Sequence, residues 1–175
     1  MCVLFRHAVI RLATLLALVP LLAGCALDTE DGLRDYLRGW VFLAQTRHFT
    51  SKSECTVAVF DLASDSLRST APVQVTEFRQ ALVYLRQDRA VWFDMPGISP
   101  HDISRAVMSL DLPSGLGLLS SGVGPATGCI ADPAVSNGFY SVMTSGLSVT
   151  LYDPAANALI LLYPPEHLLL VLRGS

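Results

Sequence analysis

The C-terminal part of the chain constrains the fold most, because it has the pattern of a β-meander. Residues 147–152 alternate between apolar and polar side chains, which is typical of a strand with one buried face. Residues 158–163 and 168–172 are apolar on both faces, and such strands need cover on both sides. The segments 153–157 and 164–167 contain Pro, Asp, Asn and His and favour turns. We expect helices on one side of this sheet, and the first hairpin or a partner on the other.

A second group of strands is predicted near the start of the chain. Aromatic and β-branched residues dominate 40–49 and 55–62, and residues 50–53 join them as a turn into a hairpin. The alternative is one continuous helix over 29–46, which Gly39 would weaken by roughly 1 kcal/mol.

Three short helices are predicted, each after a polar cap: Thr29, Thr76 and Ser99. Pro100 supports the third start, and Pro113 is expected to end that helix. The buried faces are read from apolar residues at helical spacing: Leu33, Tyr36 and Leu37; Phe78, Ala81, Leu82 and Leu85; Ile103, Ala106, Val107 and Leu110.

Residues 111–138 have no clear period and hold six of the 12 glycines. We predict a long loop there, which in a compact domain is either functional or poorly ordered. Short strands are expected at 90–93 and 139–144, the latter turning through Ser145-Gly146 into the meander. Together the elements predict an α+β domain with a mainly antiparallel sheet and two or three short helices.

The first 25 residues have the pattern of an export signal. Arg6 and Arg11 are the only charged residues before Asp28. The uninterrupted apolar core, 15–22, is far shorter than the roughly 20 residues of a membrane-spanning helix. Small residues follow it, and the segment ends in Leu22-Ala23-Gly24-Cys25.

This last segment resembles the lipobox of bacterial lipoproteins. The resemblance implies that Cys25 receives a diacylglyceryl group, that residues 1–24 are removed as a signal peptide, and that the new amino group is often acylated. It divides the chain into that signal peptide, a lipidated tether (25–31) and a single domain (32–175). Ala26 after the cysteine implies, by the same resemblance, an outer-membrane lipoprotein that faces the periplasm. The alternatives are an ordinary signal peptide with an incidental cysteine and an uncleaved anchor.

Export would leave two cysteines, Cys55 and Cys129, which most simply form a disulfide. In the chain-entropy description, closing such a long loop contributes on the order of 4 kcal/mol. A metal pair and a redox pair are the alternatives, but neither cysteine lies in a C-x-x-C motif and no histidine lies near either in the sequence.

Charge argues against one class of partner. Without residues 1–24 the chain keeps 15 acidic and 10 basic residues, a net charge of −5. Because phosphate binding needs a basic patch, we expect no nucleic-acid partner.

No catalytic or metal motif stands out. His101-Asp102 with Ser120 or Ser121 would suggest a hydrolase, but adjacent helical residues do not face each other and the G-x-S-x-G elbow is missing. Gly115-Leu116-Gly117 lacks the context of a phosphate-binding loop.

Other single residues favour structural interpretations. Ser51-Lys52-Ser53 is better explained as a solvated turn than as a Ser–Lys dyad. His48 and His167 lie near turns or strand ends, where solvated histidines are ordinary. We predict no metal site and no cofactor, since no His/Cys/Asp cluster has ligand spacing.

The sequence therefore favours two non-enzymatic functions. The first is an anchored interaction or envelope-assembly module that uses the meander and the glycine-rich segment. The second is a module that binds a small apolar ligand or a lipid, in a pocket lined by Trp40, Phe42, Trp92, Phe93 and Phe139. A hydrolase is the third possibility.

Overall fold

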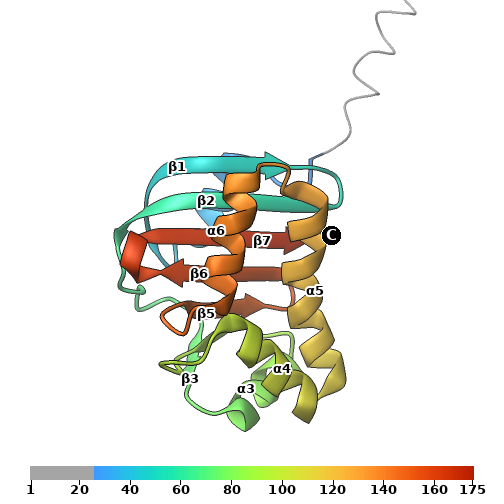
Figure 1. Ribbon diagram of the computed structural model, residues 1–175. Helices are drawn as coiled ribbons and strands as arrows, with labels where there is room; N and C mark the ends of the chain where they lie inside the picture. Colours follow the sequence, from blue (N-terminus) through green and yellow to red (C-terminus); the bar gives the residue numbers. More distant parts are fainter. Residues whose placement is uncertain (1–25) are drawn as a thin grey trace, which may run out of the picture.

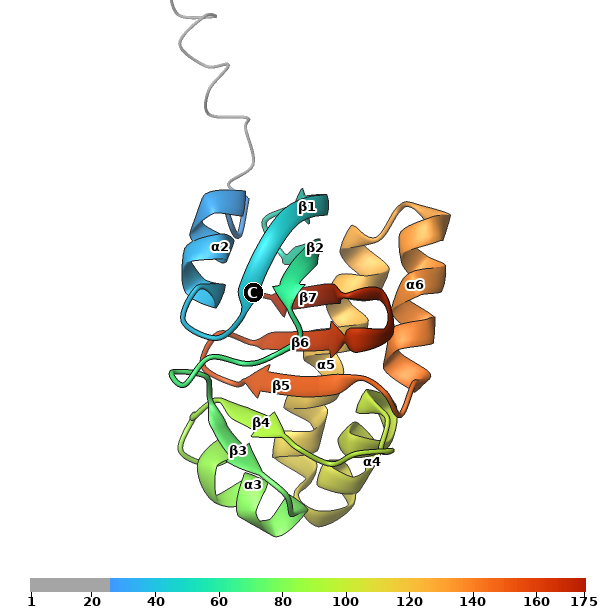
Figure 2. The same ribbon diagram turned by 90° about the vertical axis from the view of Figure 1, so that its left-hand side faces the viewer.

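The computed structural model describes residues 26–175, so the predicted signal peptide and the lipidation site Cys25 lie outside the described residues. A seven-stranded sheet forms the centre of the molecule, with helices on both faces (Figures 1 and 2). Its strand order is β1-β2-β7-β6-β5-β4-β3. The predicted α+β class with a mainly antiparallel sheet is confirmed.

The strands follow the predicted segments closely. They are β1 (Phe42–Ser51), β2 (Cys55–Ser64), β3 (Val73–Val75), β4 (Val91–Phe93), β5 (Val149–Asp153), β6 (Ala158–Tyr163) and β7 (Leu168–Gly174). The predicted hairpin is β1–β2 and the predicted meander is β5–β6–β7, all antiparallel. β7 also pairs with β2, so the hairpin and the meander form one continuous sheet. β3, for which no strand was predicted, pairs in parallel with β4.

The three predicted helices are α2 (Glu30–Leu37), α3 (Phe78–Leu85) and α4 (Pro100–Leu110). Thr29 caps α2 by accepting a hydrogen bond from the Gly32 N–H, and Ser99 caps α4. The prediction that Thr76 caps α3 is wrong: that helix begins one residue later, after Glu77, without a side-chain cap.

The prediction of a long loop over 111–138 is also wrong. The segment forms α5 (Leu112–Cys129) and most of α6 (Pro133–Thr144), so the described chain has five α-helices rather than two or three, besides a short 3₁₀ turn, η2 (Pro164–Glu166). Close packing explains several of the glycines. A Cβ on Gly115 would lie 2.2 Å from the Met108 Cα, and one on Gly122 would lie 3.0 Å from the Leu159 side chain.

The predicted strand at 139–144 is the second half of α6, which is a further correction. Phe139, Val142 and Met143 are buried at helical spacing, i, i+3 and i+4. A short apolar run of this kind does not distinguish a strand from a buried helical turn. The Ser145-Gly146 segment is therefore the exit from a helix and not a hairpin turn.

The meander is covered on both faces, as its apolar pattern predicts. Alternate residues of β6 and β7 face a core shared with α5 and α6, among them Leu161 and Leu170. The intervening residues, such as Ile160 and Val171, pack with α2. Helix α2 thus covers the face that the sequence left to the hairpin or a partner (Figure 2).

The predicted disulfide is confirmed. Cys55, the first residue of β2, is bonded to Cys129, the last residue of α5, with a Cα–Cα distance of 6.1 Å. The bond fixes the C-terminal end of α5 to the closed end of the hairpin.

Candidate functional site

The geometry does not assemble the hydrolase residues into one site. The Asp102 carboxylate accepts a hydrogen bond from the Ser99 hydroxyl at 2.7 Å, within its own helix cap. The hydroxyls of Ser120 and Ser121 both donate to the Gly117 carbonyl at 2.9 and 2.8 Å. The Ser121 hydroxyl also contacts the side-chain oxygen of Asn157, in the turn between β5 and β6. None of these bonds joins two of the proposed catalytic residues.

The other polar candidates contact neighbouring polar groups and do not form a cluster. His48 Nε2 lies 3.0 Å from the Thr50 hydroxyl, and His167, in a left-handed turn, lies 2.9 Å from an Asp65 oxygen. Within residues 26–175 no three His, Cys, Asp or Glu side chains are grouped so that they could hold a metal ion. The Lys52 ammonium donates to the Gly128 carbonyl at 2.5 Å, so it links the hairpin turn to α5.

The five aromatic residues expected to line one pocket are divided among different parts of the fold. Trp40 and Trp92 pack on the α2 side of the sheet, and Phe93 belongs to the core beneath α3 and α4. Phe42 lies under a guanidinium group rather than in a cavity. Only Phe139, on α6, borders a sizeable apolar groove.

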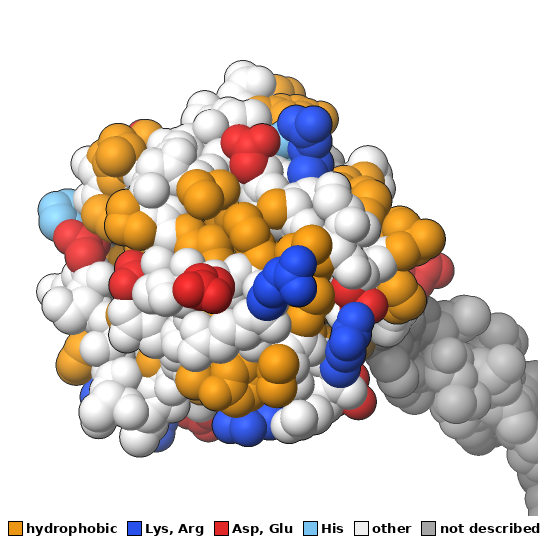
Figure 3. All heavy atoms as spheres, turned by 90° about the horizontal axis from the view of Figure 1, so that it is seen from below, with side chains coloured by type: hydrophobic (Ala, Val, Ile, Leu, Met, Phe, Trp, Pro, Cys, Tyr) orange, Lys and Arg blue, Asp and Glu red, His pale blue; other side chains and the backbone are white. Residues whose placement is uncertain are grey.

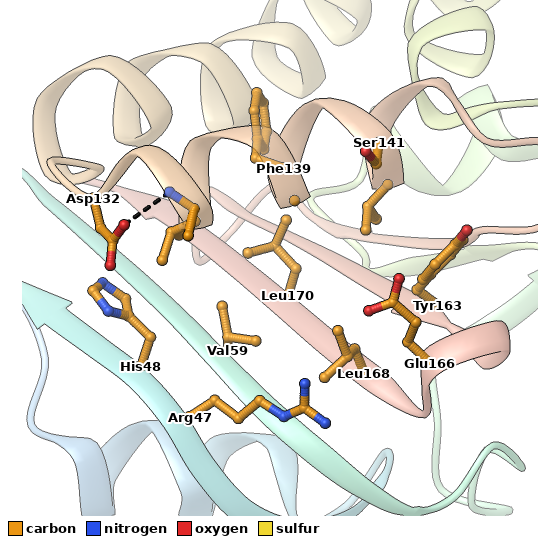
Figure 4. A pocket seen from close by; sticks show the side chains of 14 residues that line it. Arg47, His48, Val59, Asp132, Phe139, Ser141, Tyr163, Glu166, Leu168 and Leu170 are labelled. Carbon is orange, nitrogen blue, oxygen red and sulfur yellow. Dashed lines mark hydrogen bonds between the residues drawn. The ribbon is translucent and has the colours of Figure 1, made fainter.

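That groove lies between α6 and the sheet, as Figure 4 shows, and has a volume of about 370 Å³. Its floor is apolar, formed by Val59, Leu168 and Leu170 from β2 and β7. Phe139 and Val142 of α6 form the opposite wall. The size and lining suit a short apolar chain.

The rim of the groove carries both signs of charge. His48 and Asp132 lie at one end, and Glu166 lies at the other (Figure 4). Arg47 is paired with Asp61 at 2.6 Å, so its charge is already compensated. Asp132 accepts a hydrogen bond from the Ala134 N–H and caps α6. The charges on the rim therefore favour neither an anionic nor a cationic ligand.

A larger feature is the outward face of α5 and α6, which is almost free of charge. Residues 112–152 contain one charged side chain, Asp132. Five of the seven exposed large hydrophobic residues in the described part of the chain lie in this segment: Leu112, Leu116, Val123, Tyr140 and Leu147. We call the outward surface of α5 and α6 the uncharged face.

The α5 part of the uncharged face is a regular stripe. Leu112, Leu116 and Val123 follow each other at helical spacing and are 57, 49 and 47% exposed. Glycine, serine and threonine separate them on the outer surface, so the stripe is smooth as well as apolar. The sequence does contain a sign of this stripe, because its apolar residues have helical spacing and no charged residue lies among them. The many glycines in the same segment argue against a helix and hide that sign.

The apolar surface continues at the end of the molecule formed by α3 and α4. Val83 and Leu110, 56 and 45% exposed, border one hollow together with Arg79 and Arg86. Figure 3 views this end and shows hydrophobic side chains gathered near its centre, with basic and acidic side chains beside them.

The meander itself is not available as a contact surface. Its strands β6 and β7 are buried by helices on both faces, with Leu161 and Leu169 fully inaccessible. None of the exposed large hydrophobic residues lies within strands β5, β6 or β7, whereas the glycine-rich segment presents Leu112, Leu116 and Val123 on a helix.

Shifted pKa values occur at structural contacts. Burial raises the pKa of the Tyr36 hydroxyl far above its usual value, and its hydrogen bond to Asp153 at 2.7 Å adds to the shift. The pKa of Asp111 is lowered, first by the hydrogen bond from Ser114 and then by that from Arg86. Neither group borders the groove, so neither supplies it with an acid or a base.

No protein-family model matches the chain, and neither a curated protein nor a solved structure matches it. In the described residues, no helix combines the length and the apolar composition needed to cross a membrane.

Proposed function

We propose that the protein is a lipid-anchored envelope lipoprotein that acts as a non-enzymatic interaction module, with the uncharged face as its contact surface. The observation that supports this most directly is the single charged residue in 112–152. Depletion of charge together with exposed large apolar side chains is what distinguishes the core of a protein interface from ordinary surface. The partner is expected to be another protein of the envelope.

The anchor in this proposal is Cys25, through the lipobox resemblance. Each buried methylene contributes about 0.8 kcal/mol, and a single myristoyl chain binds a membrane only marginally. Two or three acyl chains on Cys25 would make the attachment stable. The location proposed is the inner leaflet of the outer membrane, with the domain in the periplasm, where the disulfide can persist.

Palmitate labelling tests the anchor separately from the partner. We expect Cys25→Ser to abolish incorporation of radioactive palmitate and to leave the precursor uncleaved. Normal labelling of this variant would refute lipidation at Cys25. The Cys55→Ser variant serves as a control for a cysteine that the proposal leaves unlipidated.

Site-specific photo-crosslinking in intact envelopes tests the contact surface. A photo-reactive amino acid at Leu116 or Val123 is expected to capture one discrete partner, whereas the same group at Asp35, exposed on α2, is not. Leu116→Glu should remove the adduct formed at position 123, because it places a charge in the interface core. Equal capture from α2, or adducts unaffected by Leu116→Glu, would contradict the proposal.

The groove beside α6 favours a second candidate function, the binding of a small apolar ligand or lipid chain. If the groove is occupied in the cell, native mass spectrometry of the gently extracted protein should show a retained mass. Leu168→Trp, which fills the floor, should remove that mass, and Leu147→Trp, at an exposed site away from the groove, should keep it. A groove that is empty in both proteins would exclude this function.

A further inference from the structure

The first residues of the described chain are fixed to the sheet and are not a free linker. The Leu27 N–H donates to the Lys52 carbonyl at 2.8 Å, and the Asp28 N–H donates to the Ser51 hydroxyl at 3.0 Å. Both acceptors lie at the closed end of the β1–β2 hairpin. Within the predicted tether, 25–31, Leu27 and Asp28 are therefore bonded to the hairpin. Helix α2 begins two residues later, at Glu30.

The side chain of Asp28 strengthens this attachment. One carboxylate oxygen accepts a hydrogen bond from the Thr56 hydroxyl at 2.7 Å, and the other forms an ion pair with Arg173. The Asp28 side chain is only 8% exposed, so the pair is largely shielded from solvent. Arg173 is itself held by the Ala156 carbonyl at 2.9 Å. Asp28 thus connects the start of the domain to β2 and β7.

Other parts of the chain meet at the same place. The Ser175 N–H donates to the Glu54 carbonyl at 3.1 Å, and Lys52 reaches the Gly128 carbonyl at the end of α5. The disulfide lies immediately behind this contact. We call the surface formed by residues 26–28, 52–54, 128 and 175 the anchor corner.

Covalent geometry limits how far Cys25 can lie from the anchor corner. Two peptide units separate its Cα from that of Leu27, a span of at most about 7.6 Å. From this we infer that, in the lipidated protein, the anchor corner lies against the lipid headgroups and the domain is held in one orientation on the bilayer. The inference rests on the lipid anchor of the proposed function.

This orientation places the α3–α4 end of the domain far from the membrane. Helices α3 and α4 pack on β3 and β4, and five inter-strand steps of about 4.8 Å separate β2 from β3, or about 24 Å. The end with Val83 and Leu110 is then directed away from the membrane. The uncharged face runs from the anchor corner, where α5 ends, toward that distal end, where α5 begins (Figure 1).

Fluorescence quenching on vesicles tests the orientation. The full lipidated protein is labelled with an environment-insensitive fluorophore at Ser175→Cys, in the anchor corner, or at the matched exposed position Ser109→Cys on α4. It is then reconstituted into phosphatidylethanolamine–phosphatidylglycerol vesicles that contain a headgroup nitroxide lipid. We expect the label at 175 to lose most of its fluorescence and the label at 109 to keep most of it.

A linker variant provides the control. Ten Gly/Ser residues inserted between Ala26 and Leu27 add an r.m.s. span of about 18 Å and should remove most of the difference between the two labels. Flotation with vesicles is measured on every sample. Protein that floats but shows equal quenching at both positions without the insertion overturns the orientation while the anchor stands. If the protein does not float with the vesicles, both the lipid anchor and the inferred orientation are wrong.

Discussion

The sheet is covered by two helical layers of opposite surface character. Helix α2 spans eight residues, four of them charged, and its Arg34 is tied to Glu30 and to Thr46 of β1. The α5–α6 layer covers the other face of the sheet with no charged residue inside either helix. Both layers bury apolar side chains against the sheet, so burial in the core does not explain the difference.

The two layers differ in the polarity of their exposed surfaces and in the contacts that fix them to the rest of the domain. The surface of α2 is the ordinary solvated one, and its polar contacts fix it to β1. The α5–α6 layer is held by a disulfide and by glycines that allow helices to approach closely. This contrast is the basis for proposing the α5–α6 surface, and not the α2 surface, as the contact surface.

Removing the disulfide should have the largest effect, because it should destabilise the α5–α6 layer and leave the α2 layer protected. We expect the double variant Cys55→Ser/Cys129→Ser to lose about 3 kcal/mol of unfolding free energy in urea. Hydrogen exchange should rise first in the last turns of α5 and leave α2 protected. Similar loss of protection in both layers would show that the bond stabilises the whole domain rather than this layer.

Two glycine substitutions in α5 should have opposite signs. Gly115→Ala forces a Cβ against the backbone of Met108 and should lower stability by about 2 kcal/mol. Gly124→Ala meets no atom within 4 Å and should raise stability by about 0.5–1 kcal/mol through helix propensity. Urea midpoints of the two variants check this; equal effects would contradict the packing role of Gly115.

Alkaline pH should affect the α2 layer through Tyr36. Its pKa is raised in the folded state, so the unfolded chain loses this proton first as pH rises past about 10. The stability that Tyr36 contributes is therefore complete below pH 10 and declines above it. Tyr36→Phe should cost about 1 kcal/mol at pH 8 and flatten the decline between pH 9 and 11.

Urea unfolding of both proteins at several pH values measures this effect. Some decline should remain in Tyr36→Phe, because burial also raises the pKa of Tyr152 on the other face of the sheet. An unchanged slope would mean that Tyr36 does not carry the pH dependence.

The same contrast separates what could and could not be predicted from the sequence. Strands β2, β5, β6 and β7 were predictable because alternation and continuous apolar runs report burial directly. Helices α2 and α4 were predictable because Thr29 and Ser99 supply caps. The disulfide could be predicted by counting cysteines, since Cys55 and Cys129 are the two that remain after the predicted signal peptide and lipidation site.

Helix α5 was not predictable by the same rules. Its glycines lower helix propensity, and their benefit, close approach to Met108 and Leu159, depends on tertiary contacts that propensity does not include. The glycine-rich segment was expected as a contact surface, but its exposed apolar stripe was missed, because exposure could not be assigned to a segment taken for a loop. The groove joins β1, β2, β7 and α6 and leaves no local signature in any of them.

The pairing of β2 with β7 has a consequence for the way the chain reaches its native state. Val57 and Leu172 are paired on neighbouring strands, although most of the chain separates them in sequence. Non-local pairing of this kind slows folding, and until it occurs the hairpin exposes an open strand edge. The sheet is therefore complete only once residues 168–174 are available to pair with β2. The incomplete forms, in which that edge is still open, are the ones most prone to aggregate.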